Sequence, residues 1–391
     1  MITLQTADNA LKTYYLDAVT DALNMKANPL LAQIEKTTSD VVGKEVRKLI
    51  RSNVNGGIGA GSETGDLPLA SSSGYTQFVA TLKNLYGTIE ISDKAIRASA
   101  NNEGAFVNLL NDEMQSLVKS ASFNFGRMLF GDGTGKIASV TNVDSDDTNE
   151  MKLDSVKALA EGMVIDVLSI AGNPISSLNR RTIVGIDRAN KTITLDGMPF
   201  SSSEVGAGAY VCMQSSAGYE ITGLGALFGD KPIYGVDRDA SVMKPYKQTA
   251  VGKISETVIQ KAIDTIEENS GSKVNFIVCS WGVKRALAEY FREVKVVMPT
   301  MQFAGGFNCV TFNGIPVVAD RFCPDGTMYL LNTEDFKLHQ LCDWQWLEGE
   351  DGKILKQIAG KPVYTATLVK YAELLCERPN GQGMLSGITE A

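Results

Sequence analysis

The chain has 391 residues, of which 44% are hydrophobic and 21% are charged, a balance typical of folded globular proteins. Its 45 acidic residues outnumber its 37 basic ones, and the net charge of -8 disfavours general binding to nucleic-acid phosphates. No apolar run reaches the roughly 18 to 20 residues that a membrane span needs, and the first residues do not match a signal peptide. We therefore expect one large or two to three ordinary folded domains, with no membrane partner.

The chain contains a single histidine, His339, within an alternating stretch that is typical of a strand. Catalytic triads need an imidazole base beside a nucleophile, and zinc sites take histidine or clustered cysteines. The six cysteines are scattered without a CxxC pair, which indicates reduced core residues in a cytosolic setting. We predict an ordinary strand role for His339 and a protein that is not an enzyme and has no cofactor or metal. Carboxylate pairs formed by distant parts of the chain stay open.

Two local patterns resemble ligand sites, and we interpret both as loops. The stretch from Gly56 to Gly65 resembles a phosphate-binding loop, but it lacks the Gly-Lys-Ser/Thr ending and the apolar helical pattern that should follow. The acidic cluster from Asp144 to Glu150 lacks the glycine and the glutamate that a calcium loop places sixth and twelfth. The first is expected to be a long flexible loop and the second a solvated linker.

In chain order, an apolar stripe over residues 9 to 27 predicts an amphipathic helical arm with one face to bury. Residues 52 to 73 are almost wholly small, polar or acidic, and strand-like segments flank them, from Glu45 to Ile50 and, in two parts, from Thr76 to Ser92. This pattern predicts a two-stranded arm with a glycine-rich tip. Because an isolated hairpin is marginal in water, the arm is expected to need a neighbouring surface.

Apolar side chains recur every three to four positions from Glu103 to Phe130, which predicts a helix about 42 Å long that acts as a spine. Residues 136 to 215 predict a small all-β module with a hairpin joined by DRAN. From residue 216 onward the pattern is mixed α and β. The elements expected there are a helix between Ser255 and Gly271, a helix from Trp281 to Phe291, and strands at Val274 to Cys279, Val310 to Phe312, Ile315 to Ala319, Met328 to Asn332 and Lys361 to Leu375.

This order of parts resembles the major capsid protein of tailed bacteriophages, the Hong Kong ninety-seven type of shell subunit. The resemblance is carried by SSSGYTQFVATLKNLYGTIEISDKAIRAS, which runs into the long helix, and by FNGIPVVADRFCPDGTMYLLNTEDFKLHQ and YTATLVKYAELLCERPNGQGMLSGI. It covers most of the chain outside residues 136 to 215, and it rests on order and spacing rather than on one short motif.

The resemblance implies an α+β fold and a structural function. It implies a head subunit that self-assembles into pentamers and hexamers of an icosahedral shell around the double-stranded DNA of a phage. The implied parts are an N-terminal arm at 1–45, an extended hairpin loop at 46–92, a peripheral domain with the spine helix at 93–135 and 320–385, an inserted β domain at 136–215 on the outer surface, and an axial domain at 216–319.

The same resemblance implies partners and an interface. We expect a separate scaffolding protein, a portal, a possible decoration protein, and DNA enclosed without sequence-specific binding, in a virion capsid assembled in the cytoplasm of a bacterial host. Some family members cross-link through a lysine on the extended loop, but no lysine lies between Lys48 and Lys83, so noncovalent contacts are expected. The interface residues expected are Leu11, Tyr15, Gly57, Gly59, Gly61, Glu63, Asp66, Tyr75 and Phe78.

Three alternatives stay open at this point. A subunit of an encapsulin-like compartment would share the fold and would have an inner pocket for a cargo peptide. A nucleotide-binding enzyme would use the Gly56 to Gly65 loop, and alanine at Gly57, Gly59 and Gly61 would then abolish ligand binding. A tail-tube or adhesin component fits less well, because the long helix suits neither all-β architecture.

Overall fold

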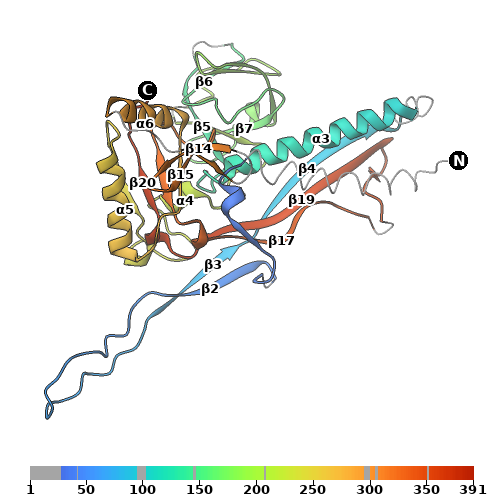
Figure 1. Cartoon of the computed structure of the whole chain (residues 1–391). Helices are drawn as coiled ribbons and strands as arrows, with labels where there is room; N and C mark the ends of the chain where they lie inside the picture. The colour runs from blue at the N-terminus through green and yellow to red at the C-terminus, as the bar shows by residue number, and fades with distance from the viewer. Residues whose placement is uncertain are drawn as a thin grey trace.

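The computed structural model describes residues 28–41, 43–94, 103–143, 147–206, 208–294, 300–303, 307–349 and 352–391. These residues form a long sheet with a helix along it, a mixed sheet covered by two further helices, a closed β-barrel, and a hairpin that projects from the body (Figure 1). The expected α+β class is confirmed.

The long sheet joins strands from both halves of the chain. Its central strand β19 pairs antiparallel with β17 on one side and with β4 on the other, and β1 adds in parallel to β17. The helix α3 (Glu103–Met128) runs beside β4, where Gly87 lies against the side chain of Leu117 (Figure 1). The strands are β1 (Glu35–Thr37), β4 (Lys83–Ser92), β17 (Phe336–Trp346), β18 (Lys356–Gln357) and β19 (Val363–Cys376).

The pairing of β4 corrects one prediction about the hairpin. The sequence places both segments between Thr76 and Ser92 on its return side, but only β3 (Tyr75–Thr81) pairs with β2 (Glu45–Arg51). β4 turns away and pairs with β19 over its whole length. Alternation reveals a strand with one buried face, but it does not reveal which partner covers that face.

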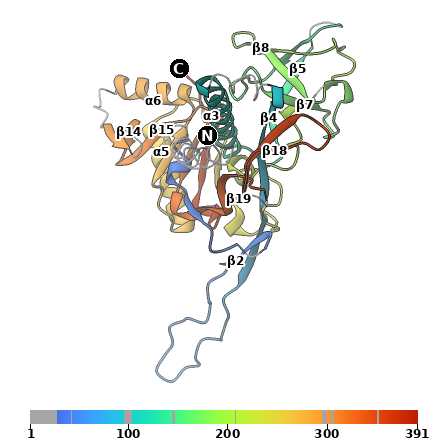
Figure 2. The same cartoon turned by 90° about the vertical axis from the view of Figure 1, so that its right-hand side faces the viewer.

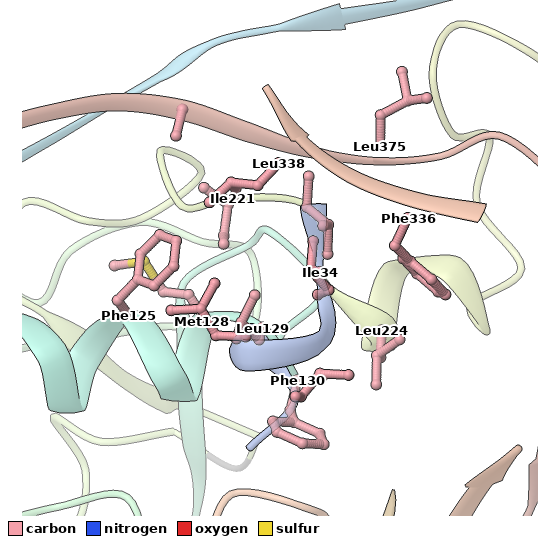
Figure 3. Close-up of a cluster of buried hydrophobic side chains, with 14 of the residues drawn as sticks. Ile34, Phe125, Met128, Leu129, Phe130, Ile221, Leu224, Phe336, Leu338 and Leu375 are labelled. Carbon is pink, nitrogen blue, oxygen red and sulfur yellow. The ribbon is translucent and has the colours of Figure 1, made fainter. Parts of the chain in front are cut away.

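The main core lies where the C-terminal end of α3 meets β17. Phe125, Met128 and Leu129 are at most 4% exposed, and they gather with Ile34 and Leu338 in one cluster (Figure 3). Leu224, from the short helix α4 (Leu224–Leu227), joins the same cluster. In the part of the helix whose side chains are described, Met114, Phe125 and Met128 of the predicted apolar period are buried.

The mixed sheet has the strand order β11-β20-β16-β12-β15-β14-β13. Its central strand β12 is buried on both faces, with Ile277 packed in the cluster of α5 and α6 and Val278 in the main core. The helices are α5 (Glu256–Ser270) and α6 (Trp281–Glu293). The strands are β11 (Tyr246–Gln248), β12 (Phe276–Cys279), β13 (Thr300–Phe303), β14 (Phe307–Phe312), β15 (Ile315–Ala319), β16 (Met328–Leu331) and β20 (Gly383–Leu385).

The ends of α5 follow the predicted capping residues. The Ser255 hydroxyl accepts a hydrogen bond from the Val258 N–H, and Gly271 ends the helix with a φ of 67°, a left-handed conformation that glycine adopts without strain. The mixed sheet also takes β16 and β20 from residues 320–385. The range that the resemblance gives to a peripheral domain therefore contributes strands to both sheets.

The barrel is a separate folded unit with its own core. Its strands close in the order β10-β5-β6-β9-β8-β7, between Lys136 and Met213, inside the range for which the sequence predicts an all-β module. Ile165, Ile193 and Val211 are fully buried inside it. The hairpin predicted around DRAN is confirmed as β8 and β9. The strands are β5 (Lys136–Asn142), β6 (Glu150–Leu153), β7 (Val164–Leu168), β8 (Arg181–Asp187), β9 (Thr192–Leu195) and β10 (Tyr210–Met213).

Candidate assembly surfaces

The projecting hairpin is the most exposed part of the described chain. β2 and β3 pair in register from Glu45 opposite Thr81 to Arg51 opposite Tyr75, and the loop of residues 52–74 extends beyond them (Figures 1 and 2). We call residues 52–74 the hairpin loop. Every residue from 58 to 72 is exposed. A loop of this length without secondary structure of its own is uncommon in a compact domain and is usually functional or disordered.

Large apolar side chains on the hairpin loop face solvent. Val54, Ile58, Leu67 and Leu69 are between 82% and 90% exposed. Burying one such side chain fully contributes about 1.5–3 kcal/mol, so a surface that covered all of them would be bound strongly. A single copy therefore leaves these apolar side chains of the hairpin loop uncovered.

The backbone of the hairpin loop does not have the shape of a phosphate cradle. Its ends are joined by a hydrogen bond from the Ser52 N–H to the Gly74 carbonyl at 2.9 Å, and its tip turns between Ser62 and Gly65. None of its glycines has a positive φ, and β3, not a helix, follows it. Phosphate-binding loops instead curl their N–H groups inward at the start of a helix. The backbone is therefore that of an extended arm.

The predicted interface residues divide into three groups. Gly59, Gly61, Glu63, Asp66 and Tyr75 are exposed, and Gly57 is half-buried with its N–H bonded to Asn55 at 2.8 Å. Leu11 and Tyr15 lie outside the described residues.

Phe78 requires a correction, because it is fully buried inside its own chain. Its ring lies 5.6 Å from the ring of Tyr234, so it anchors the hairpin and is not part of a free surface.

Tyr234, which sequence reasoning missed, fixes the base of the hairpin to the body. Its carbonyl accepts a hydrogen bond from the Val79 N–H at 2.9 Å, next to Phe78. Its buried hydroxyl donates to the Leu374 carbonyl at 3.2 Å and accepts from the Cys376 N–H at 3.0 Å. One side chain thus links β3 to β19. No motif marks it, because its partners lie far away in the sequence.

Buried charged groups hold the segment around Thr222 against the long sheet. The carboxylate of Glu373, which is 2% exposed, accepts hydrogen bonds from the N–H groups of Thr222 at 2.6 Å and Leu374 at 3.0 Å. Burial raises the pKa of Glu373 to about 7. Nearby, Arg127 of α3 forms a buried ion pair with Glu220. These contacts orient the chain where the helix, β19 and the hairpin meet.

A second buried charge lies on the opposite face of β19. The Lys370 ammonium, 1% exposed, donates to Asp343 Oδ1 at 2.6 Å and to Gln340 Oε1 at 2.8 Å, and it lies over the ring of Phe125. Burial lowers the pKa of Lys370. Burial alone would raise the pKa of Asp343, but Lys370 and Lys36 hold it at about 2. The pair connects α3, β17 and β19 at one point.

His339 lies on a strand, as predicted, but in an environment that the sequence did not indicate. The ring is fully buried, although Leu341 on the same strand is 52% exposed, and neither ring nitrogen has a hydrogen-bond partner in the described part of the chain. Burial lowers its pKa, so the imidazole is neutral at pH 7. All six cysteines are free, five of them buried, and burial raises the pKa of Cys212 and Cys279 to about 12.

The described residues offer neither a metal site nor a membrane-spanning helix. No group of three histidine, cysteine, aspartate or glutamate side chains there is arranged to hold a metal ion. None of the described helices has the length and apolar character required to cross a bilayer.

Comparison with known proteins gives a fold but no close relative. No family model matches the sequence, and no curated protein matches it. Among solved structures, the capsid asymmetric unit of cyanophage A-1(L) has a TM-score of 0.58 and 10% identity, over 93% of this chain and 93% of that chain. The structure described as Mycobacterium phage Bobi reaches a TM-score of 0.48 at 9% identity, over 94% and 92% of the two chains.

An encapsulin shares part of this likeness. The holo-SrpI encapsulin complex from Synechococcus elongatus PCC 7942 has a TM-score of 0.46 at 9% identity, over 93% of this chain and 89% of that chain. The cyanophage subunit aligns over as much of this chain with a higher TM-score. The chain therefore has the fold of a tailed-phage capsid subunit, as its resemblance to the Hong Kong ninety-seven type implied.

Proposed function

We propose that this protein is the major capsid subunit of a tailed bacteriophage. In this proposal it assembles with itself into pentamers and hexamers of an icosahedral shell that encloses double-stranded DNA. The hairpin loop is the observation that carries the proposal, because it exposes four large apolar side chains and is anchored to the body through Phe78 and Tyr234. The capsid fold over 93% of the chain supports it.

The architecture suits a subunit that meets several neighbours. A contact between two different surfaces of one protein repeats from copy to copy, and it closes into a ring when the rotation allows. Rings of five and six copies must meet at different angles, and a projecting arm can follow such differences more easily than a flat patch. Many contacts of modest strength then hold a closed shell together.

The parts of the chain take roles in this proposal. Residues 1–45 are the N-terminal arm, with Leu11 and Tyr15 on its apolar stripe. Residues 46–81 supply the extended loop, because β4 belongs to the long sheet. Residues 93–135 with 320–385 form the peripheral domain, and residues 216–319 the axial domain. Residues 136–215 form an inserted domain on the outer surface, where a decoration protein could bind.

The proposal also includes the partners that assist assembly and the cellular location of assembly. The subunit has a structural role without catalysis, and a separate scaffolding protein and a portal assist assembly in the cytoplasm of the host. The finished location is the virion. Because the sequence has no lysine between Lys48 and Lys83, contacts at the loop are noncovalent.

The test is electron microscopy with sedimentation velocity on the purified chain, expressed alone and with its neighbouring genes. The proposal predicts closed icosahedral particles, or pentamers and hexamers that convert into them. A monodisperse monomer or dimer in both preparations would contradict it. Particles that carry a protein cargo and exclude DNA when a packaging system is supplied would favour the encapsulin alternative.

A further inference from the structure

A basic pocket lies at the junction between the barrel and the mixed-sheet region. It is a hollow of about 220 Å³ near the N-terminal end of α6. The residues that line it are Lys157, Arg188, Trp281, Asp320, Arg321 and Cys323. Lys157 and Arg188 come from the barrel region, and the others come from the mixed-sheet side. We call these residues the basic pocket.

The positive charges of the basic pocket are only partly neutralised. Lys157 is paired with Asp325, but no carboxylate lies within ion-pair distance of Arg188 or Arg321 in the described part of the chain. The Arg321 guanidinium stacks 4.5 Å from the centre of the Phe123 ring. The planar group is thus oriented, and its N–H donors remain available for a carboxylate.

Two further side chains define what could bind there. Trp281 is 55% exposed at the pocket, with the Lys284 ammonium 5.6 Å from its ring centre. Asp320, which also lines the pocket, is buried and accepts a hydrogen bond from the Phe322 N–H at 2.9 Å. Arg188 Nη1 donates to the Val156 carbonyl at 3.4 Å, and neither Arg188 nor Arg321 has a carboxylate partner among the described residues. An exposed indole beside these two guanidinium groups suits a ligand that offers both carboxylates and apolar side chains.

The hairpin loop has this complementary chemistry. Glu63 lies within the turn between Ser62 and Gly65, Asp66 directly follows that turn, and both residues are exposed. Leu67 and Leu69 follow directly and are 89% and 90% exposed. The loop contains no lysine or arginine between Arg51 and Lys83. On a chain with a net charge of -8, an acidic tip is repelled by most surfaces and attracted by a positive one.

The loop and the pocket of one copy do not meet. The hairpin projects from one end of the molecule, whereas the barrel and α6 lie at the other end in both views (Figures 1 and 2). A contact between the loop and the pocket therefore joins two copies through different surfaces. Such a contact is head-to-tail, and it produces rings when it closes.

We propose that the tip of the hairpin loop, from Glu63 to Leu69, docks into the basic pocket of a neighbouring copy. The carboxylates of Glu63 and Asp66 pair with Arg188 and Arg321, and the leucines cover Trp281. This proposal rests on the proposed function, since it specifies which surface receives the loop in the shell.

The first test reverses charge on each side separately and then on both. One variant carries Arg188→Glu with Arg321→Glu, a second carries Glu63→Arg with Asp66→Arg, and the third combines all four changes. Either reversal alone should reduce the fraction of chain in particles at least about tenfold, as expected for close charge pairs at an interface. The combined variant should recover most of the loss. A matched control, Lys253→Glu with Lys261→Glu, adds the same charge at exposed positions elsewhere and should assemble as the wild type does.

The second test detects the contact directly in the particles that form. Cysteines replace Asp66 and Lys157, and assembled particles are oxidised mildly. The proposal predicts a disulfide between chains, seen as a ladder on non-reducing gels, and none when Asp66→Cys is combined with Lys261→Cys. Circular dichroism of each unassembled variant establishes that it is folded.

The outcomes separate the two proposals. If wild-type chain forms no particles, the proposed function fails and the docking falls with it. If wild-type particles form but the combined variant does not recover, or no disulfide appears, only the docking is wrong. If the pocket reversal leaves assembly intact but weakens binding of a DNA oligonucleotide, the pocket serves nucleic acid and the docking is overturned.

Discussion

The hairpin and the barrel are both antiparallel β structures. They differ in how much of their strand pairing and apolar burial is completed within a single copy. The barrel pairs every one of its strands on both sides and buries its own cluster, in which Ile165 and Val211 are fully covered. The hairpin pairs only β2 with β3 and leaves Leu67 and Leu69 about nine-tenths exposed. The barrel buries its apolar side chains within one copy, whereas the hairpin loop leaves its own exposed.

This difference separates the folding stability of one copy from the stability of contacts between copies. A closed barrel presents no free strand edges for other chains, so it can be inserted into a larger fold without promoting uncontrolled association. The hairpin keeps its base in the core through Phe78 and leaves its loop exposed. Changes in the barrel should therefore alter folding, and changes in the loop should alter assembly.

The largest expected effect comes from making the hairpin loop polar. We predict that Val54→Ser, Ile58→Ser, Leu67→Ser and Leu69→Ser together reduce particle formation at least about a hundredfold, because each buried side chain contributes about 1.5–3 kcal/mol. Stability of the unassembled chain should stay nearly unchanged, since these side chains are exposed in one copy. Sedimentation velocity at equal total concentration measures the particle fraction.

The matched control places serine at Ile170, Val184 and Met198, which are exposed on or beside the barrel. This control should assemble as the wild type does. If the control failed to assemble and the loop variant assembled normally, the barrel surface and not the hairpin loop would be the one required for assembly.

Removing the anchor of the hairpin should cost folding stability. Phe78→Ala leaves a cavity beside Tyr234 and should lower the free energy of unfolding by about 3–5 kcal/mol. Tyr75→Ala, three residues away on the exposed side, should lower it by no more than about 0.5 kcal/mol. Urea unfolding followed by tryptophan fluorescence compares the two, and equal losses would show that Phe78 is not the anchor.

A cavity in the barrel should have a local effect. Ile165→Ala should destabilise the barrel by about 2–5 kcal/mol, because Ile165 is fully buried there. Hydrogen exchange read by mass spectrometry should show faster exchange between residues 136 and 213, while α5 and β12 keep their protection. Faster exchange throughout the chain would contradict the independence of the barrel.

The smallest effect concerns the buried carboxylate beside the hairpin base. Burial raises the pKa of Glu373 from 4.5 to about 7, so the stability linked to its neutral form is fully present below pH 4.5 and is lost as the pH rises through 7. The unassembled wild type should gain stability from pH 8 to pH 5, and Glu373→Gln should gain less. Urea midpoints at both pH values test this, and parallel slopes for the two proteins would contradict it.

Local signals predicted the elements well. The period of α3, the capping pair Ser255 and Gly271, and the DRAN hairpin all depend on residues close together in the sequence, and each was found where the pattern places it. The exposed glycines and acids of the hairpin loop were likewise identified by composition alone.

Long-range pairings could not be predicted in this way. β4 pairs with β19, which lies some 270 residues further along the chain. The sequence of neither strand identifies the other as its pairing partner. The alternating pattern around Phe78 predicts that its side chain is buried. Whether Tyr234 or a neighbouring copy covers it depends on where residue 234 lies in the fold. The burial of Glu373 and Lys370 was missed for the same reason, because charged residues are normally exposed unless distant groups pair with them.

The most direct measurement is a cryo-electron microscopy map of assembled wild-type particles in which the hairpin loop can be traced. The map should show residues 52–74 lying against another copy, with Val54, Ile58, Leu67 and Leu69 covered by it. A map in which the loop folds back onto its own chain, or extends into solvent with those side chains uncovered, would contradict the role of the hairpin in assembly.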